Sequence, residues 1–249
     1  MNEEHRTFLN AIINALPESA RGYISAPTVT SWMVMLIILG LVIAGTRRMQ
    51  TSPTSKLQVL IEWTYETFTG FCRNVIGPGS DRFVPFLATQ FMFILTMNYC
   101  GLLPGFISPT TSLNITLALA LSTFAMVQIS GFRAHGLKYL MHFVGEPIWL
   151  APLNIPIHVI GELARPLSLS IRLFGNIFGE DMVIAKLIGM AAVALPWWLP
   201  IPFQFPMLLF GLFTGFVQAL VFLILSAAYI GGAVEKHEAH EEHPVAQAA

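Results

Sequence analysis

Six charged side chains lie in a segment that is otherwise as apolar as a membrane-spanning helix. The segment covers residues 147–195, and its charged residues are Glu162, Arg165, Arg172, Glu180, Asp181 and Lys186. A charge at the middle of a bilayer costs about 2.5–3.5 kcal/mol on the insertion scale. Such charges persist where they face protein or water, and they commonly mark an ion or substrate path. The chemistry that this segment predicts is therefore the movement of protons or other ions.

Helical geometry places Arg172 on a face that a partner could approach. Residues three, four or seven positions apart share one face of a helix. The residues that share or border the face of Arg172 are small, hydroxyl, amide or basic: Arg165, Ser168, Gly175, Asn176 and Gly179. Because small residues let another helix come close, we expect Arg172 to meet a partner group instead of lipid.

The acids of the segment lie too far along the helix to pair with Arg172. Glu162 precedes it by ten residues and Glu180 follows it by eight, which corresponds to roughly 15 Å and 12 Å along the axis. Arg165 is three residues after Glu162, the spacing of an ordinary helix-surface ion pair. The alternative for Arg172 is a side chain that snorkels to the interface, but uncharged residues extend about two turns to either side. The pattern favours a relay with a fixed positive charge between two titratable groups.

A matching polar stripe occurs on the last apolar segment. Its members are Thr214, Gln218 and Tyr229, with Gly211 and Gly215 on the same side. Gln218 could hydrogen-bond to the Arg172 guanidinium or to a chain of water. The alternative, which the sequence leaves open, is an ordinary polar contact between helices.

The composition excludes several classes of protein. Of the 249 residues, 55% are apolar and only 11% are charged, and the mean hydropathy is +0.66. A water-soluble enzyme would have to expose much of this apolar surface, so an integral membrane protein is indicated. A net charge of −1 disfavours a nucleic-acid binder, so we expect no nucleic-acid partner. We predict no cofactor and no metal site.

The long uncharged runs define an all-α fold in a single membrane domain, residues 1–249. We expect the following order: an outward N-terminus at 1–27, a transmembrane helix at 28–46, an interfacial amphipathic helix at 57–76, a transmembrane hairpin at 83–132, two tilted membrane helices at 151–195 and 201–234, and a disordered cytoplasmic tail at 235–249. The alternative for 57–76 is a buried helix of the soluble type. Prolines up to Pro206 should restrict the last helix to about Met207–Gly232. His237, His240 and His243 in the tail are interpreted as solvated residues, not as metal ligands.

Basic residues set the orientation. They gather between the first span and the hairpin, and again after the hairpin, whereas the hairpin tip at 104–112 has no charge. By the positive-inside rule both basic stretches are cytoplasmic, so we expect the N-terminus outside and the C-terminus in the cytoplasm. The lack of a basic leader before the first span fits a multi-pass protein of a bacterial plasma (inner) membrane, and it also fits an organelle-encoded protein.

The residues around Arg172 resemble subunit a of the F-type (F1Fo) ATP synthase. The similarity rests on Pro166-Leu-Ser-Leu-Ser-Ile-Arg172-Leu-Phe-Gly-Asn176, Ile-Phe-Gly-Glu180-Asp181 and Gln218-Ala-Leu-Val-Phe, and on Asn98-Tyr-Cys-Gly-Leu-Leu-Pro104-Gly and Pro109-Thr-Thr-Ser-Leu-Asn114-Ile-Thr in the hairpin. It covers roughly residues 28–235.

This resemblance implies a proton-translocating stator subunit with two offset half-channels, which couples ion flow to rotation and ATP synthesis. The last two helices would form a long, tilted hairpin against a ring of c subunits. The further partners would be b-type peripheral stalk subunits, the F1 head through the stalk, and the lipid bilayer. The chain would have no catalytic site of its own. The ring contact is expected at Arg172, Gly175, Gly179 and Gln218.

The resemblance also implies roles for individual residues. Arg172 resembles the essential arginine that faces the ring carboxylate. The remaining candidates for proton translocation are His158, Glu162, Ser168, Asn176, Glu180, Asp181 and Gln218. The family has an acid nine residues after the arginine, which selects Asp181, but Glu180 at eight stays an alternative.

Two other positions depart from common patterns of the family. Some branches have an acid fourteen residues before the arginine, where this chain has His158. Other branches have the acid ten residues before the arginine, as this chain does with Glu162. Some relatives have a histidine seven residues before the glutamine, where this chain has Gly211. An acid–histidine pair in the outer channel is therefore absent or rebuilt here.

Two other classes of protein compete with a stator subunit. A small proton-coupled secondary transporter would also need intramembrane charges and broken helices, but the sequence contains no internal repeat. A membrane scaffold without transport would have no use for acids on both sides of a deep arginine.

Overall fold

The computed structural model describes residues 25–47, 56–103, 106, 108–136, 139, 151–194 and 204–235. The elements are α3 (Ala26–Thr46), α4 (Lys56–Ile76), η1 (Ser80–Phe83), α5 (Val84–Leu102), η2 (Pro109–Thr111), α6 (Leu113–His135), α8 (Ala151–Ala194) and α9 (Gln204–Glu235). Within these ranges every regular element is a helix. Most of the predicted outward N-terminus and nearly all of the predicted tail, with its three histidines, lie outside the described residues.

Four of the described helical segments are long and apolar enough to cross a membrane. They are Ala26–Thr46, Ser80–Leu102, Leu113–His135 and Leu208–Val234. The prediction of an all-α integral membrane protein is confirmed, and the chain is a multi-pass one.

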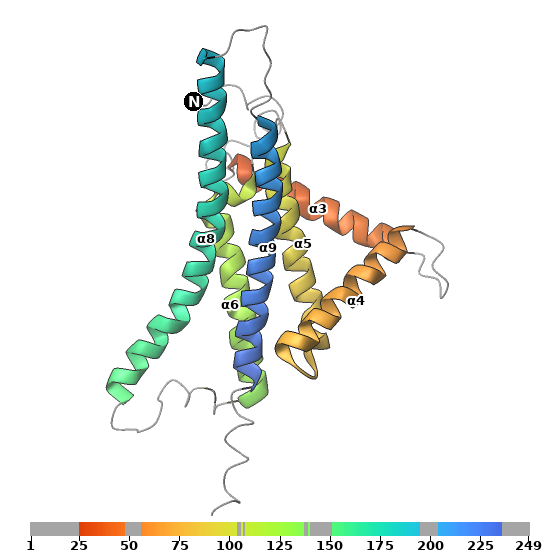
Figure 1. Ribbon diagram of the computed structural model, residues 1–249. Helices are drawn as coiled ribbons and strands as arrows, with labels where there is room; N and C mark the ends of the chain where they lie inside the picture. Colours follow the sequence, from red (N-terminus) through yellow and green to blue (C-terminus); the bar gives the residue numbers. More distant parts are fainter. Residues whose placement is uncertain are drawn as a thin grey trace, which may run out of the picture.

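Helices α8 and α9 are longer than the hydrocarbon core of a bilayer is thick. α8 has 44 residues and α9 has 32, which gives lengths of about 66 Å and 48 Å. The hydrocarbon core is about 30 Å thick. In Figure 1 part of α8 runs beside α9 and the rest of it diverges, and α3 lies across their direction. The tilt of α8 and α9 in the bilayer stays a prediction.

α9 begins at Gln204, three residues before the expected Met207. Pro206 therefore lies within the first turn of α9, whereas the sequence pattern predicts a helix that begins after this proline. The first N–H groups of a helix have no partner within it, so a residue without an N–H is tolerated there. α8 also continues through Pro156 and Pro166.

The core lies where α4, α5, α6, α8 and α9 pack together. One buried cluster joins α4, α5 and α9 and includes Phe68, Leu87 and Ile230. A second joins α3, α5, α6, α8 and α9 and includes Val34, Ile94, Leu173 and Phe222. α4 has a buried face with Phe68 and an exposed face with Trp63, as its amphipathic pattern requires.

Polar contacts connect the hairpin to the two long helices. Asn98 on α5 donates from Nδ2 to the carbonyl oxygen of Gly215 on α9 at 3.1 Å, and accepts a hydrogen bond from Thr110 at 3.0 Å. The hydroxyl groups of Thr116 on α6 and Ser170 on α8 are 3.1 Å apart. Buried polar groups that satisfy one another favour one arrangement of helices, and these contacts lie close in sequence to Gln218 and Arg172.

Candidate ion-translocation site

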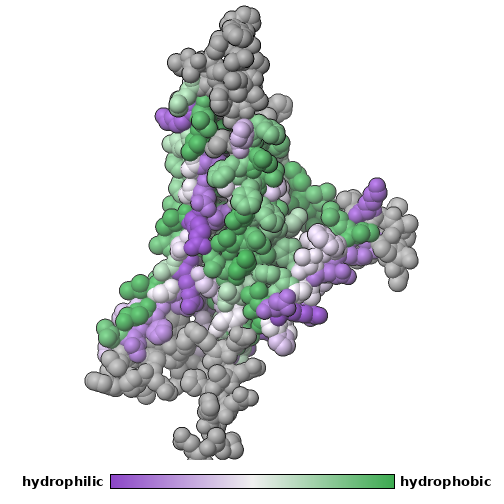
Figure 2. All heavy atoms as spheres, in the orientation of Figure 1, coloured by the Kyte–Doolittle hydropathy of each residue, from purple (hydrophilic) through white to green (hydrophobic). Residues whose placement is uncertain are grey.

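Arg172 lies on the outer surface of α8 without a counter-ion among the residues that the structure describes. The residue is exposed, and it makes no ion pair or hydrogen bond with any other residue that the structure describes. Exposed apolar side chains such as Leu167, Ile171 and Phe178 are near it in sequence. Figure 2 shows a hydrophilic stripe along α8, beside α9, between apolar surfaces. The surface therefore presents a positive charge in apolar surroundings.

One turn after Arg172, the two polar stripes meet. Asn176 donates from Nδ2 to Oε1 of Gln218 at 2.6 Å. Gln218 is only 2% exposed, and its Nε2 has no hydrogen-bond partner among the described residues. A buried amide with an unused donor is costly unless water or another acceptor reaches it. Gln218 thus contacts Asn176, and of the two alternatives for Gln218 the contact between helices is the one observed.

Glu180 lies buried between α8 and α9, whereas Asp181 is exposed. Glu180 is 8% exposed and accepts a hydrogen bond at Oε2 from Thr214 at 2.9 Å. A Cβ atom built on Gly211 would collide with Oε1 of Glu180. The glycine therefore leaves the space into which this carboxylate fits, at the position where some relatives have a histidine.

A cavity of about 350 Å³ connects these groups. Its polar wall consists of Asn176, Glu180, Thr214 and Gln218, and its apolar wall includes Val183, Phe210 and Phe213. A space of this size with several polar partners can hold water. The cavity can therefore carry a hydrogen-bonded path from Glu180 to the turn that follows Arg172.

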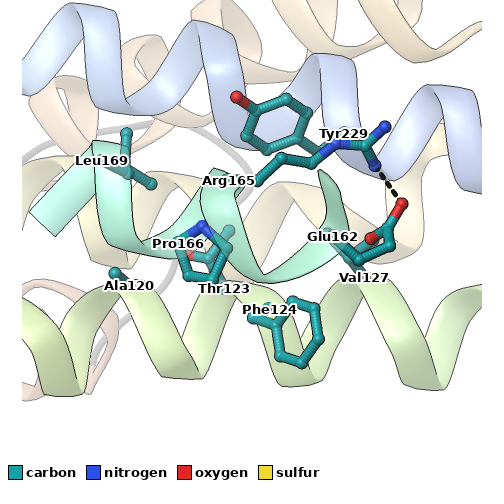
Figure 3. A pocket seen from close by; sticks show the side chains of 9 residues that line it. All are labelled: Ala120, Thr123, Phe124, Val127, Glu162, Arg165, Pro166, Leu169 and Tyr229. Atoms are coloured by element: carbon teal, nitrogen blue, oxygen red, sulfur yellow. Dashed lines mark hydrogen bonds and ion pairs between the residues drawn. The ribbon is translucent and has the colours of Figure 1, made fainter. Parts of the chain in front are cut away.

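A second polar cluster surrounds Glu162 on the N-terminal side of Arg172. Oε1 of Glu162 is 2.6 Å from Nη1 of Arg165, and Gln128 on α6 donates to Oε2 at 3.3 Å. The Arg165 guanidinium lies 5.2 Å from the ring centroid of Tyr229 on α9. Figure 3 shows Glu162, Arg165 and Tyr229 at a small pocket between α6, α8 and α9. The pocket has a volume of about 10 Å³, room for roughly one water.

The other predicted residues spread along α8. Ser168, Gly175 and Gly179 are exposed on the same helix as Arg172, and His158 is half-buried one turn before Glu162. A Cβ atom on Gly175 or Gly179 would meet nothing within 4 Å, so both glycines leave open surface for a neighbour.

Sequence reasoning missed Gln128. A single amide side chain in an apolar helix commonly makes an ordinary polar contact with another helix, so it does not indicate a site by itself. Its partner Glu162 is 34 positions away in the chain. No local signal could have connected the two.

The fold and this site define a class: a multi-pass, all-α membrane protein. The longest helix that the structure describes carries an arginine, without an ion-pair partner among the described residues, between two partly buried acids. Comparison with known proteins specifies the family. The family model for the ATP synthase A chain matches residues 28–231. ATP synthase subunit a 1 of Syntrophotalea carbinolica is 42% identical over 210 residues, 84% of this chain and 85% of that protein. ATP synthase subunit a of Syntrophobacter fumaroxidans is 40% identical over 238 residues, 92% of this chain and 96% of its own. ATP synthase subunit a of Geobacter sulfurreducens is 37% identical over 210 residues, which cover 84% of this chain and 87% of that protein.

The chain therefore belongs to the ATP synthase subunit a family. The resemblance that the Arg172 motif indicated is confirmed, and the alternative of a small secondary transporter is not favoured.

Proposed function

We propose that this chain is the proton-translocating stator subunit in the membrane sector of an ATP synthase, and that Arg172 is the cation that faces each carboxylate of a passing ring of c subunits while that carboxylate is ionised. Family membership supports the role. The observation that carries the mechanism is the guanidinium of Arg172, which is exposed on a polar stripe of α8 between apolar surfaces and has no ion-pair partner among the described residues. A cation in such surroundings needs a counter-charge, and a carboxylate on another polypeptide would supply it.

The structure supports Glu180 as the acid of the outward half-channel. Its carboxylate borders the 350 Å³ cavity and is bonded to Thr214, whereas Asp181 is exposed away from that cavity. A proton would enter at Glu180, follow water and polar groups past Asn176 and Gln218, and reach the ring carboxylate beside Arg172. After rotation it would leave past Glu162 and His158.

Arg172 separates the two half-channels. Its guanidinium stays protonated at any accessible pH, so it repels a proton that would cross directly from one acid to the other. The same charge favours the ionised form of a carboxylate that faces it. The membrane potential supplies about 2.3 kcal/mol per charge for each 100 mV, so the attraction must stay of that order if the ring is to move on.

The direct ring contact is assigned to Arg172, Gly175 and Gly179, which are exposed. Gln218 is buried beneath Asn176, so its effect on the ring would act through Asn176. Stalk subunits and the F1 head are the further partners of the proposal. The N-terminus lies outside and the C-terminus in the cytoplasm of a bacterial inner membrane.

Cysteine cross-linking tests the contact with a ring. In complete ATP synthase, with Cys72 and Cys100 replaced by Ala, Gly175→Cys should cross-link to a small hairpin subunit that carries a cysteine beside its carboxylate. Ile37→Cys on α3, exposed on a different helix, is the control and should not. Equal cross-linking at both positions, or none at Gly175, would overturn the proposal. A transporter would instead carry protons alone in liposomes, without a ring or a soluble head.

A further inference from the structure

The second acid, Glu162, is hydrogen-bonded to two residues that the proposed proton path does not include, Arg165 and Gln128. Both of its carboxylate oxygens accept hydrogen bonds, one from Arg165 and the other from Gln128. Its side chain is 16% exposed. An ordinary helix-surface ion pair needs only the first of these contacts, so the second, from another helix, requires an explanation.

Gln128 is itself held by a residue beyond the end of α6. The hydroxyl group of Tyr139 is hydrogen-bonded to Gln128. Tyr139 is 7% exposed, and its ring packs against Phe132 with centroids 5.1 Å apart. Burial raises the pKa of the Tyr139 phenol, whereas the hydrogen bond with Gln128 lowers it, as a donor to the phenol oxygen does. The Gln128 N–H₂ group therefore donates to Tyr139 as well as to Glu162, which its two N–H bonds allow.

The backbone near Gln128 makes room for this tyrosine. A Cβ atom on Gly131 would collide with the Tyr139 ring. On the opposite side, the Tyr229 ring lies against the Arg165 guanidinium (Figure 3), a cation–π contact that holds the planar group in place. Side chains from α6 and α8 thus contact the Glu162 carboxylate, and one from α9 contacts Arg165.

We propose that Arg165 and Gln128 are positioning residues that fix the Glu162 carboxylate as the proton acceptor on the exit side, with Tyr139 and Tyr229 holding them in turn. The proposal rests on the proposed function, because it takes Glu162 as the exit station. A fixed carboxylate receives a proton from one direction and passes it to water without first changing rotamer. Misplacement of a reacting group by about 1 Å can cost up to ~100-fold in rate.

ATP-driven proton pumping in inverted vesicles tests the proposal. We expect Arg165→Gln and Gln128→Leu each to slow pumping by roughly tenfold, and Arg165→Lys, which keeps a donor and the charge, to retain most of the rate. In a Glu162→Gln background, neither substitution should slow pumping any further. A merely structural role would not produce this dependence on Glu162. Lys186→Gln, which removes an exposed cation from the same helix, is the matched control and should pump normally.

The outcomes distinguish two failures. If Glu162→Gln pumps at the wild-type rate with the complex intact, Glu162 is not the exit station, and both the proposed route and this inference fail. If Glu162→Gln is slow but Arg165→Gln and Gln128→Leu pump normally, only the positioning role fails. Equal slowing by Arg165→Gln with and without Glu162 would likewise overturn it. The amounts of ring and soluble head that co-purify with each variant show whether assembly is intact.

Discussion

The carboxylate of Glu180 fills a space that exists because residue 211 is a glycine. A Cβ atom at position 211 would collide with Oε1 of Glu180, while Oε2 accepts a hydrogen bond from Thr214 at 2.9 Å. The acid on α8 and the missing side chain on α9 are therefore complementary. Their relationship fixes the position of one of the polar groups that line the cavity shared with Asn176 and Gln218.

Gly211→Ala should displace the Glu180 carboxylate. Because the added methyl group collides with Oε1, we expect slower passive proton conduction in vesicles stripped of the soluble head. Shortening the acid in Gly211→Ala/Glu180→Asp should restore part of the rate. Gly232→Ala, where a Cβ would meet nothing within 4 Å, is the control. Unchanged conduction in Gly211→Ala would show that the position of Glu180 is not critical.

Thr214→Val should slow the same conduction while leaving the shape of the cavity nearly unchanged. The substitution removes the hydroxyl that donates to Glu180. A hydrogen bond contributes roughly 0.5–1.5 kcal/mol, which corresponds to about a twofold to tenfold change in rate. Thr214→Ser keeps the donor and should conduct as the wild type does. Equal rates for the Val and Ser variants would mean that this bond plays no part in transport.

Asn98→Leu should destabilise the packing of α5 on α9. The variant leaves the buried Thr110 hydroxyl without its acceptor at Asn98 and the Gly215 carbonyl without its second donor. The Thr110 hydroxyl keeps Ser108 as a neighbour at 2.7 Å, so the cost is that of two lost hydrogen bonds at about 0.5–1.5 kcal/mol each. We therefore expect a lower melting temperature of the detergent-solubilised complex. Thr96→Val removes a hydroxyl that bonds only to the backbone of its own helix, and should melt close to the wild type. If both variants melt alike, the Asn98 contacts contribute little.

The sequence located the residues whose charge is out of place, and it could not locate those whose role depends on a distant partner. Arg172, Glu162 and Glu180 are conspicuous because a charge in an apolar run demands an explanation. Asn98 and its partner Gly215 are 117 residues apart, and only the folded chain brings them together. Glu180 and Asp181 also differ in a way that spacing could not show: the spacing of the family selects Asp181, whereas the structure buries Glu180 and exposes Asp181.

The fold was predictable for a similar reason. Long uncharged runs can only be membrane helices, and the amphipathic pattern at 57–76 indicates a helix where the structure has α4 (Lys56–Ile76). The first residue of α9 was harder to predict from the sequence, because a proline can either precede a helix or lie in its first turn. Pro206 lies in the first turn.

The central claim is that the Arg172 guanidinium, as a permanent positive charge, pairs with an ionised carboxylate on another subunit and so drives the release of its proton. ATP-driven proton pumping by inverted vesicles that carry Arg172→Ala, with the amount of assembled complex matched to the wild type and Lys186→Gln as control, tests it most directly. The account predicts that Arg172→Ala abolishes pumping while Lys186→Gln pumps normally. Pumping by Arg172→Ala at the wild-type rate would contradict it.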